Sequence, residues 1–167
     1  TARLPWLLIG MLGGIGNSMI LGNFDTTFAA HPEMALYIPL IGGTGGNVGT
    51  QSSALVVQGL ANSSLDSGNT FQQILKESVV ALINATIISM LVYIYNFIRF
   101  GATATVSYSV SISLFAVVMF ASIFGTLVPM TLEKLKIDPA IATGPFISIT
   151  NDIIGMMMYM GITVLLS

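Results

Sequence analysis

Apolar residues run through the chain in five long stretches, and polar or charged residues gather between them. Each stretch is long enough for one membrane-spanning helix of about 20 residues. The stretches run from Leu4 to Phe24, Met34 to Leu65, Ser78 to Ile98, Phe100 to Leu132, and Pro139 to the end. The pattern predicts an all-α membrane protein with five transmembrane helices, at about 5–24, 36–60, 77–98, 108–131 and 140–165.

The segments between the predicted helices carry the residues of turns and linkers. Residues 25–32 are expected to form a short polar turn, and residues 62–70 a polar linker before the lead-in at 72–77. Pro139 suits the first turn of the last helix, because a proline has no N–H to leave unpaired there. Residues 1–167 are therefore interpreted as a single transmembrane domain.

The composition favours a bilayer over water as the solvent. Of the 167 residues, 54% are hydrophobic and 7% are charged, and the mean hydropathy is +0.87. A soluble domain has about 25% charged residues, so a soluble enzyme and a nucleic-acid partner are both disfavoured. The chain has one His, no Cys and no base–nucleophile pair at membrane depth, which argues against an enzyme.

Basic residues near the helix ends predict the orientation in the cell membrane. One side holds Arg3, Lys76, Lys134 and Lys136, and the other holds only Arg99. Because basic residues are enriched on the cytoplasmic side, we expect a multi-pass protein with a cytoplasmic N-terminus and an external C-terminus. The first residue is Thr1 rather than Met, so we expect N-terminal cytoplasmic parts to be missing from this chain.

An odd number of spans cannot be divided into two equal inverted halves. A pathway across the membrane would then lie between copies of the chain. A homodimer is the simplest expectation, because closed two-fold symmetry is the commonest oligomeric arrangement.

Asp152 is the one ionised group in the interior of a predicted span. A carboxylate at mid-bilayer is costly unless it faces water, a cation or a partner, so it marks a candidate functional site. Small and polar residues continue its face of the helix at Gly144, Ser148, Gly155 and Tyr159. The alternative is a neutral, hydrogen-bonded acid that joins helices.

The second predicted helix is unusually rich in glycine. Five glycines and a proline fall within about a dozen residues: Pro39, Gly42, Gly43, Gly45, Gly46 and Gly49. Irregular or closely approached backbone is tolerated in a membrane only where it is buried in protein or lines water. Asn47 and Gln51 share one face, where their oxygens can bind the water shell of a passing cation. The alternative, compatible with the first, is a packing face of small residues.

Two segments together resemble the membrane domain of the MgtE family of magnesium channels. The first is Pro39–Ser53, with the core Pro-Leu-Ile-Gly-Gly-Thr-Gly-Gly-Asn-Val-Gly-Thr-Gln, and the second is Ile137–Tyr159, with Asp138-Pro139-Ala140, Gly144-Pro145 and Asn151-Asp152. The opening Arg3-Leu4-Pro5-Trp6-Leu7-Leu8 is similar to the family's entry to its first helix. The resemblance covers essentially the whole chain.

The resemblance implies a homodimer of five-helix subunits, with the second and fifth helices lining a magnesium pore on the two-fold axis. Hydrated Mg²⁺ would be held by the carboxylate of Asp152 and the carbonyl of Ser148. Full-length members also carry cytoplasmic domains that sense magnesium, and we expect these to be missing from this chain. The candidate metal-binding residues are Asp152, Ser148, Gly144 and Asn47, and the candidate pore-lining residues are Gly45, Gly46, Gln51, Gly155 and Tyr159.

Two other functions fit the same pattern. One is an ion-coupled divalent-cation carrier, similar to the eukaryotic magnesium transporters of the solute-carrier class. The other is a membrane structural subunit that transports nothing, in which the polar faces are only helix contacts. The first expectation remains a channel that conducts hydrated Mg²⁺ into the cytoplasm, with the lipid bilayer and a second copy of the chain as its partners.

Overall fold

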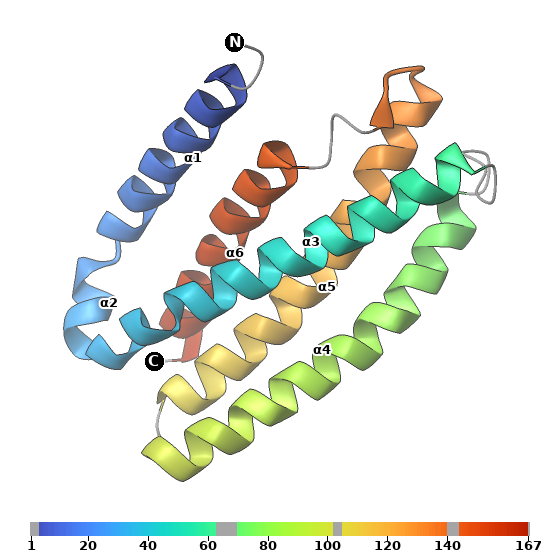
Figure 1. Ribbon diagram of the computed structural model, residues 1–167. Helices are drawn as coiled ribbons and strands as arrows, with labels where there is room; N and C mark the ends of the chain where they lie inside the picture. Colours follow the sequence, from blue (N-terminus) through green and yellow to red (C-terminus); the bar gives the residue numbers. More distant parts are fainter. Residues whose placement is uncertain (1–3, 63–69, 102–104, 140–143, 167) are drawn as a thin grey trace.

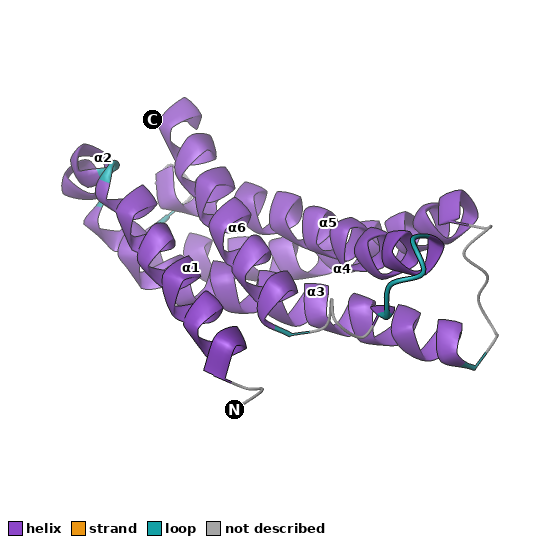
Figure 2. Ribbon diagram, turned by 90° about the horizontal axis from the view of Figure 1, so that it is seen from above, coloured by secondary structure: helices purple, strands orange, loops and turns teal. Residues whose placement is uncertain are grey.

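The computed structural model describes residues 4–62, 70–101, 105–139 and 144–166, and within these ranges the chain is helical with no strand. Figures 1 and 2 show long helices packed side by side. The elements are α1 (Leu4–Gly22), α2 (Asp25–Ala30), the 3₁₀ helix η1 (Pro32–Tyr37), α3 (Ile38–Ala61), α4 (Thr70–Phe100), α5 (Thr105–Lys134) and α6 (Pro145–Leu166).

Four of the described helices are long and apolar enough to cross a membrane, which makes this a membrane protein. They span Leu4–Gly22, Thr70–Phe100, Thr105–Lys134 and Phe146–Leu166. The remaining long helix, α3, has 24 residues but is less apolar, because glycines and amides occupy much of it. At 1.5 Å per residue it reaches about 36 Å, enough for a core of about 30 Å. The prediction of five spans therefore stays a prediction at α3.

The long helices alternate in direction along the chain (Figure 1). As a consequence, α1 and α6 run the same way and begin at the same end of the bundle, while α3 runs against both. This alternation places α3 and α6 antiparallel beside each other, and the two are in contact.

The centre of the bundle is α5, which contacts α3, α4 and α6 and contributes more buried residues than any other described helix. A buried apolar cluster joins its first half to η1, α3 and α6; its members are Met34, Tyr37, Ile41, Val106, Val110, Leu114, Val117, Met156, Tyr159 and Met160. In contrast, α1 has no buried residue and packs chiefly on α6. Helix α1 is therefore only lightly packed against the rest of the bundle.

Glycines allow α3 to approach its neighbours closely. A Cβ at Gly45 would lie 2.8 Å from Cγ1 of Val117 on α5, and one at Gly49 would collide with Asn151 on α6. A Cβ at Gly125 of α5 would lie 2.6 Å from the backbone oxygen of Gly49. Small residues at helix contacts in membranes work in this way, by letting backbones touch.

The expected polar turn at 25–32 is wrong, because the segment is helical. Residues 25–30 form α2 and residues 32–37 form η1, so the next long helix begins at Ile38. The segment is held to the bundle by its apolar side chains, since Met34 and Tyr37 are buried. The Tyr37 hydroxyl also donates a hydrogen bond to Oδ1 of Asn96 on α4.

Two helix boundaries also differ from the expectation. The polar lead-in at 72–77 is already helix, because α4 begins at Thr70; nothing in that stretch breaks a helix, and Glu77 accepts a hydrogen bond from Ser52 at 2.9 Å. The last helix begins at Pro145 rather than near 140, so Pro145 and not Pro139 takes its first turn. Residues 63–69 of the expected linker and residues 140–143 lie outside the described residues.

We predict that Gly125→Ala lowers the free energy of unfolding by about 1–3 kcal/mol, the usual cost of overpacking. The reason is that the new methyl group would meet the α3 backbone, which cannot rotate away as a side chain can. The matched control is Gly161→Ala on α6, where a Cβ meets nothing within 4 Å. Thermal unfolding of the detergent-solubilised variants measures both, and equal midpoints would contradict the prediction.

Candidate functional site

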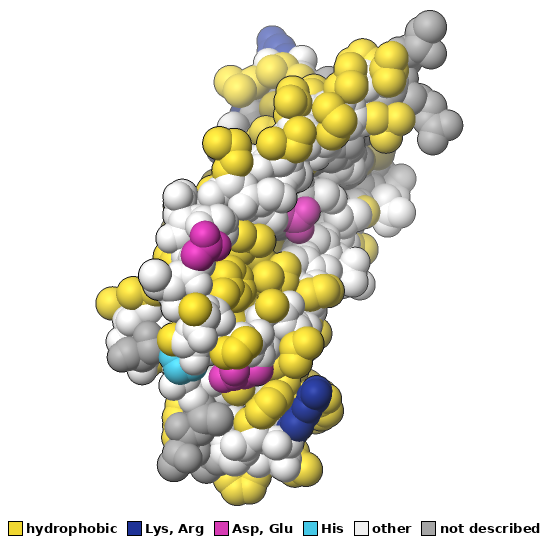
Figure 3. All heavy atoms as spheres, turned by 90° about the vertical axis from the view of Figure 1, so that its left-hand side faces the viewer, with side chains coloured by type: hydrophobic (Ala, Val, Ile, Leu, Met, Phe, Trp, Pro, Cys, Tyr) yellow, Lys and Arg dark blue, Asp and Glu magenta, His cyan; other side chains and the backbone are white. Residues whose placement is uncertain are grey.

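A groove of about 830 Å³ runs along the side of the bundle between α1, α3 and α6. Figure 3 looks onto the α1 side of the molecule, where acidic side chains lie among hydrophobic and uncharged ones. The lining residues are Asn17 from α1; Ile38, Pro39, Gly42, Gly43, Gly46, Asn47, Thr50, Gln51 and Ala54 from α3; and Ser148, Asp152 and Met156 from α6.

Among the described residues that line the groove, Asp152 is the only one with an ionisable side chain. It is half-buried on the middle turns of α6, and within the described ranges no Lys or Arg forms an ion pair with it. Gly42 of α3 lies opposite, where a Cβ would be 3.5 Å from Oδ1 of Asp152. The missing side chain at Gly42 leaves the carboxylate open to the groove.

The glycines of α3 divide between two faces. Gly42, Gly43 and Gly46 line the groove, and a Cβ at Gly43 or Gly46 would meet nothing within 4 Å. Gly45 and Gly49 are buried on the opposite side, against α5 and α6. One helix therefore provides close packing on one face and open space on the other.

Side chains with neutral oxygens line the same groove as the carboxylate. Asn47, Thr50 and Gln51 are exposed on α3, and Ser148 lies one turn before Asp152 on α6. Within the described chain, the groove included, no three His, Cys, Asp or Glu side chains come close enough to hold a metal ion. The groove thus offers one carboxylate with amide and hydroxyl oxygens. Such a set of ligands is better suited to a cation that keeps its water shell than to a cation that must lose it.

Five of the residues selected from the sequence line this groove: Asp152, Ser148, Asn47, Gly46 and Gln51. They come from two helices that the chain separates by about a hundred residues, and the antiparallel contact of α3 with α6 brings them together. The other four selected residues, Gly45, Gly155, Tyr159 and Gly144, lie outside the groove.

Gly45 and Gly155 both pack on α5 instead. They contact the same side chain, Val117: an added Cβ would lie 2.8 Å from it at Gly45 and 3.7 Å at Gly155. Gly155 is buried, and so is Gly45. The two glycines therefore set how closely α3 and α6 approach α5.

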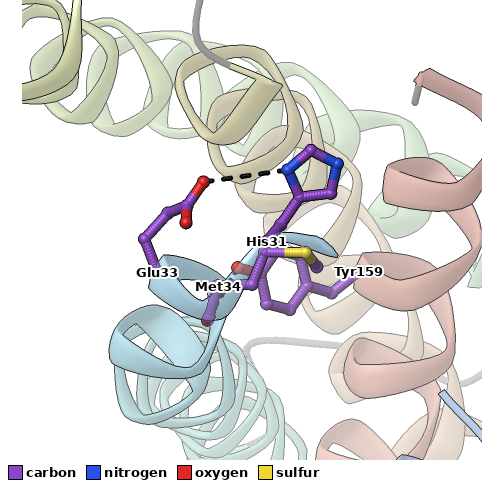
Figure 4. A network of polar contacts seen from close by, with 4 residues as sticks. All are labelled: His31, Glu33, Met34 and Tyr159. Carbon is purple, nitrogen blue, oxygen red and sulfur yellow. Dashed lines mark hydrogen bonds and ion pairs between the residues drawn. The ribbon is translucent and has the colours of Figure 1, made fainter. Parts of the chain in front are cut away.

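Tyr159 is fully buried, and its hydroxyl donates a hydrogen bond to the backbone oxygen of Met34 at 2.9 Å. Figure 4 shows the Tyr159 ring pointing from α6 to the η1 segment. Beside it, Nδ1 of His31 lies 3.8 Å from Oε1 of Glu33. The tyrosine fastens η1 to α6 and does not face the groove.

Gly144 lies at the beginning of α6. Its backbone has φ of +121°, which L side chains rarely adopt, and its carbonyl accepts a hydrogen bond from the N–H of Ser148 at 3.1 Å. Pro145 follows at the first helical position. Gly144 thus sets where α6 starts, and so sets the position of Ser148 and Asp152 along the groove.

Sequence reasoning did not select several groove residues, among them Asn17, Thr50 and Met156. Thr50 lies beside the chosen Gln51 and would have followed from the same helix face. Asn17 had a signal of its own, since it is an amide in the middle of an apolar run. Its helix, α1, could be assigned to the groove only once its place beside α6 was known.

The family model of MgtE, described as a divalent cation transporter, matches residues 38–162. Over 160 residues the chain is 34% identical to the magnesium transporter MgtE of Bacillus subtilis (strain 168), covering 96% of this chain and 35% of that protein. Over 165 residues it is 33% identical to the magnesium transporter MgtE of Thermus thermophilus, covering 99% of this chain and 36% of that protein. The chain thus spans about a third of the length of these curated relatives.

Proposed function

Because the chain belongs to the MgtE family of divalent cation transporters, we propose that it carries Mg²⁺ across the membrane along the groove between α1, α3 and α6. The observation that carries the proposal is the unpaired carboxylate of Asp152, half-buried in that groove. Two relatives that match nearly the whole chain are named as magnesium transporters, which makes Mg²⁺ the first choice of cargo.

The chemistry of the groove suits Mg²⁺ that keeps its water. Mg²⁺ gives up its water reluctantly and is bound through one or two carboxylates with several waters retained. In the proposed mechanism, Asp152 attracts the hydrated ion. Oxygens of Asn47, Gln51 and Ser148 then accept hydrogen bonds from its water shell. A groove of about 830 Å³ has room for an ion in this form.

We propose that two copies of the chain form the complete pathway. The groove is open along one side of a single chain, and a second copy across a two-fold axis would close it. Two Asp152 side chains would then face one lumen and raise the local concentration of cations. Mutual repulsion of the two carboxylates would be relieved by the bound cation, which favours occupancy by a divalent ion.

We also propose that all five long helices cross the membrane, with the beginning of α1 on the cytoplasmic side. Three of the polar residues that lower the hydropathy of α3, Asn47, Thr50 and Gln51, lie on its groove face, where they would meet water and not lipid. Lys134 at the end of α5 lies at the bundle end where α1 begins, in agreement with the excess of basic residues on that side.

Asp152→Asn and Asp152→Ala are each expected to lower Mg²⁺ uptake into proteoliposomes by about tenfold or more, because they remove the charge that concentrates the ion. The control is Glu133→Gln, which removes an exposed carboxylate at the end of α5, outside the groove. Wild-type uptake and selectivity in both Asp152 variants would overturn the proposed role. Undetectable uptake of every divalent cation by the unmodified protein would overturn transport itself.

Gly46→Leu is expected to block uptake without unfolding the protein. A Cβ at Gly46 meets nothing within 4 Å, so the leucine side chain has room to extend into the groove and obstruct it. Gly10→Leu on α1 is the matched control, since a Cβ there also meets nothing and Gly10 does not line the groove. Equal Mg²⁺ uptake by the two folded variants would show that the groove is not the pathway.

The homodimer can be tested with single thiols, because the chain contains no cysteine. Thr50→Cys places a thiol at an exposed position of the groove, and Ile87→Cys places one on the exposed face of α4. A short bis-thiol crosslinker applied in membranes is expected to link the Thr50 variant into a species of twice the mass. Equal crosslinking at Ile87, or none at Thr50, would contradict a groove-to-groove dimer.

A further inference from the structure

Asn17 is the one residue of α1 that lines the groove. Its side chain is half-buried, and its oxygen Oδ1 is buried without a hydrogen-bond partner. A buried amide oxygen left unpaired costs free energy, so in native proteins such atoms nearly always have a partner. Within the described chain nothing supplies that partner, although the oxygen belongs to a residue on the wall of the groove.

The depth of Asn17 in the bundle follows from the contact between α1 and α6. An ideal Cβ at Gly13 would lie 2.5 Å from Cγ2 of Ile149, so these two residues are at the same level. The two helices run in the same direction (Figure 1) and each rises about 1.5 Å per residue. Four residues beyond Gly13 is Asn17, and three residues beyond Ile149 is Asp152. Asn17 therefore lies within about one residue rise of Asp152 in depth.

The third wall of the groove at this level is Gly42, whose ideal Cβ would be 3.5 Å from Oδ1 of Asp152. One level of the groove thus combines a carboxylate from α6, an amide from α1 and an absent side chain on α3. A hydrated cation at this level would meet one negative charge and one neutral acceptor.

We infer that Asn17 is a specificity-determining residue of the cation site, whose Oδ1 accepts a hydrogen bond from a water molecule in the first shell of the cation held at Asp152. The inference rests on the proposed function. The protons of water bound to a divalent cation are strong donors, and a fixed acceptor favours an ion that keeps that water. Because Mg²⁺ dehydrates reluctantly and Ca²⁺ accepts flexible direct ligands, Asn17 favours Mg²⁺.

A purely structural role for Asn17 would predict something else. An amide that joins α1 to α6 would have its oxygen paired with a donor on α6, and Oδ1 has no such partner. The packing of α1 on α6 is provided instead by the contact of Gly13 with Ile149. Loss of the amide should therefore change cation binding more than stability.

The test compares Asn17→Leu with Asn17→Asp, which keeps an oxygen at the same position, and with Asn84→Leu, the same change at an exposed site on α4. The protein is reconstituted in liposomes, and the initial rates of Mg²⁺ and Ca²⁺ uptake are measured against concentration. Asn17→Leu is expected to raise the half-saturating Mg²⁺ concentration by about threefold to tenfold, the effect of losing one hydrogen bond to a charged donor. Its Mg²⁺/Ca²⁺ rate ratio should fall, while Asn17→Asp and Asn84→Leu keep the unmodified half-saturation or a lower one.

Thermal unfolding separates this from a structural effect. The midpoint without cation should be the same for Asn17→Leu and Asn84→Leu, whereas the rise in the midpoint on adding Mg²⁺ should be smaller for Asn17→Leu. If Asn17→Leu is not monodisperse, Asn17→Ala removes the same oxygen without adding apolar volume.

The outcomes for Asn17 and Asp152 can be told apart. If Asn17→Leu, or Asn17→Ala in its place, retains unmodified half-saturation and ion preference while Asp152→Asn abolishes uptake, the role of Asn17 is overturned and the proposed function stands. If Asp152→Asn also transports as the unmodified protein does, the proposed site itself is overturned. A failure of Asn17→Asp equal to that of Asn17→Leu would overturn the role of the oxygen as an acceptor.

Discussion

The close approach of α3 to α5 and α6 is the constraint on which the rest of the structure depends. A methyl group at Gly125 of α5 would meet the backbone of Gly49, and one at Gly49 would collide with the side chain of Asn151 on α6. This contact uses only one face of α3, and the turn of the helix then presents Gly42, Gly46 and Asn47 on the other side, along the groove. If α3 stood further out, its amides would face lipid, where polar groups without partners are costly.

The second constraint is electrostatic. A carboxylate inside a bilayer needs water, a cation or a donor, and within the described chain Asp152 has no basic partner. The fold meets this need by placing Asp152 on the wall of an open groove and not in the core, so the same geometry that relieves the charge also exposes it to ions. Stability and the proposed transport thus place the same requirement on α6.

Periodicity along a helix predicts which residues share a face, but not which neighbour covers that face. Asp152 and Ser148, which the small, polar stripe of the last helix singled out as candidate metal-binding residues, both line the groove. The same stripe continues to Gly155 and Tyr159, which were predicted to line a pore. In the structure these two residues lie away from the groove: Gly155 packs against Val117, and Tyr159 bonds to Met34. The stripe leaves the groove where α6 packs against η1 and α5. The boundary at Pro145 was missed for a local reason, since the left-handed backbone of Gly144 cannot be read from its residue type alone.

The sequence by itself determined that the chain is helical and membrane-embedded, because its apolar runs are long enough to span a bilayer and it has too few charges for a water-exposed surface. It also singled out Asp152 and the glycine-rich helix, since both are anomalies whatever they contact. Only the tertiary structure decided that Gly45 packs while Gly46 opens onto the groove, and that Asn17 of α1 stands level with Asp152. Those facts depend on contacts between helices far apart in the chain, and hydrophobic patterning, which is local, does not encode which helix lies beside which.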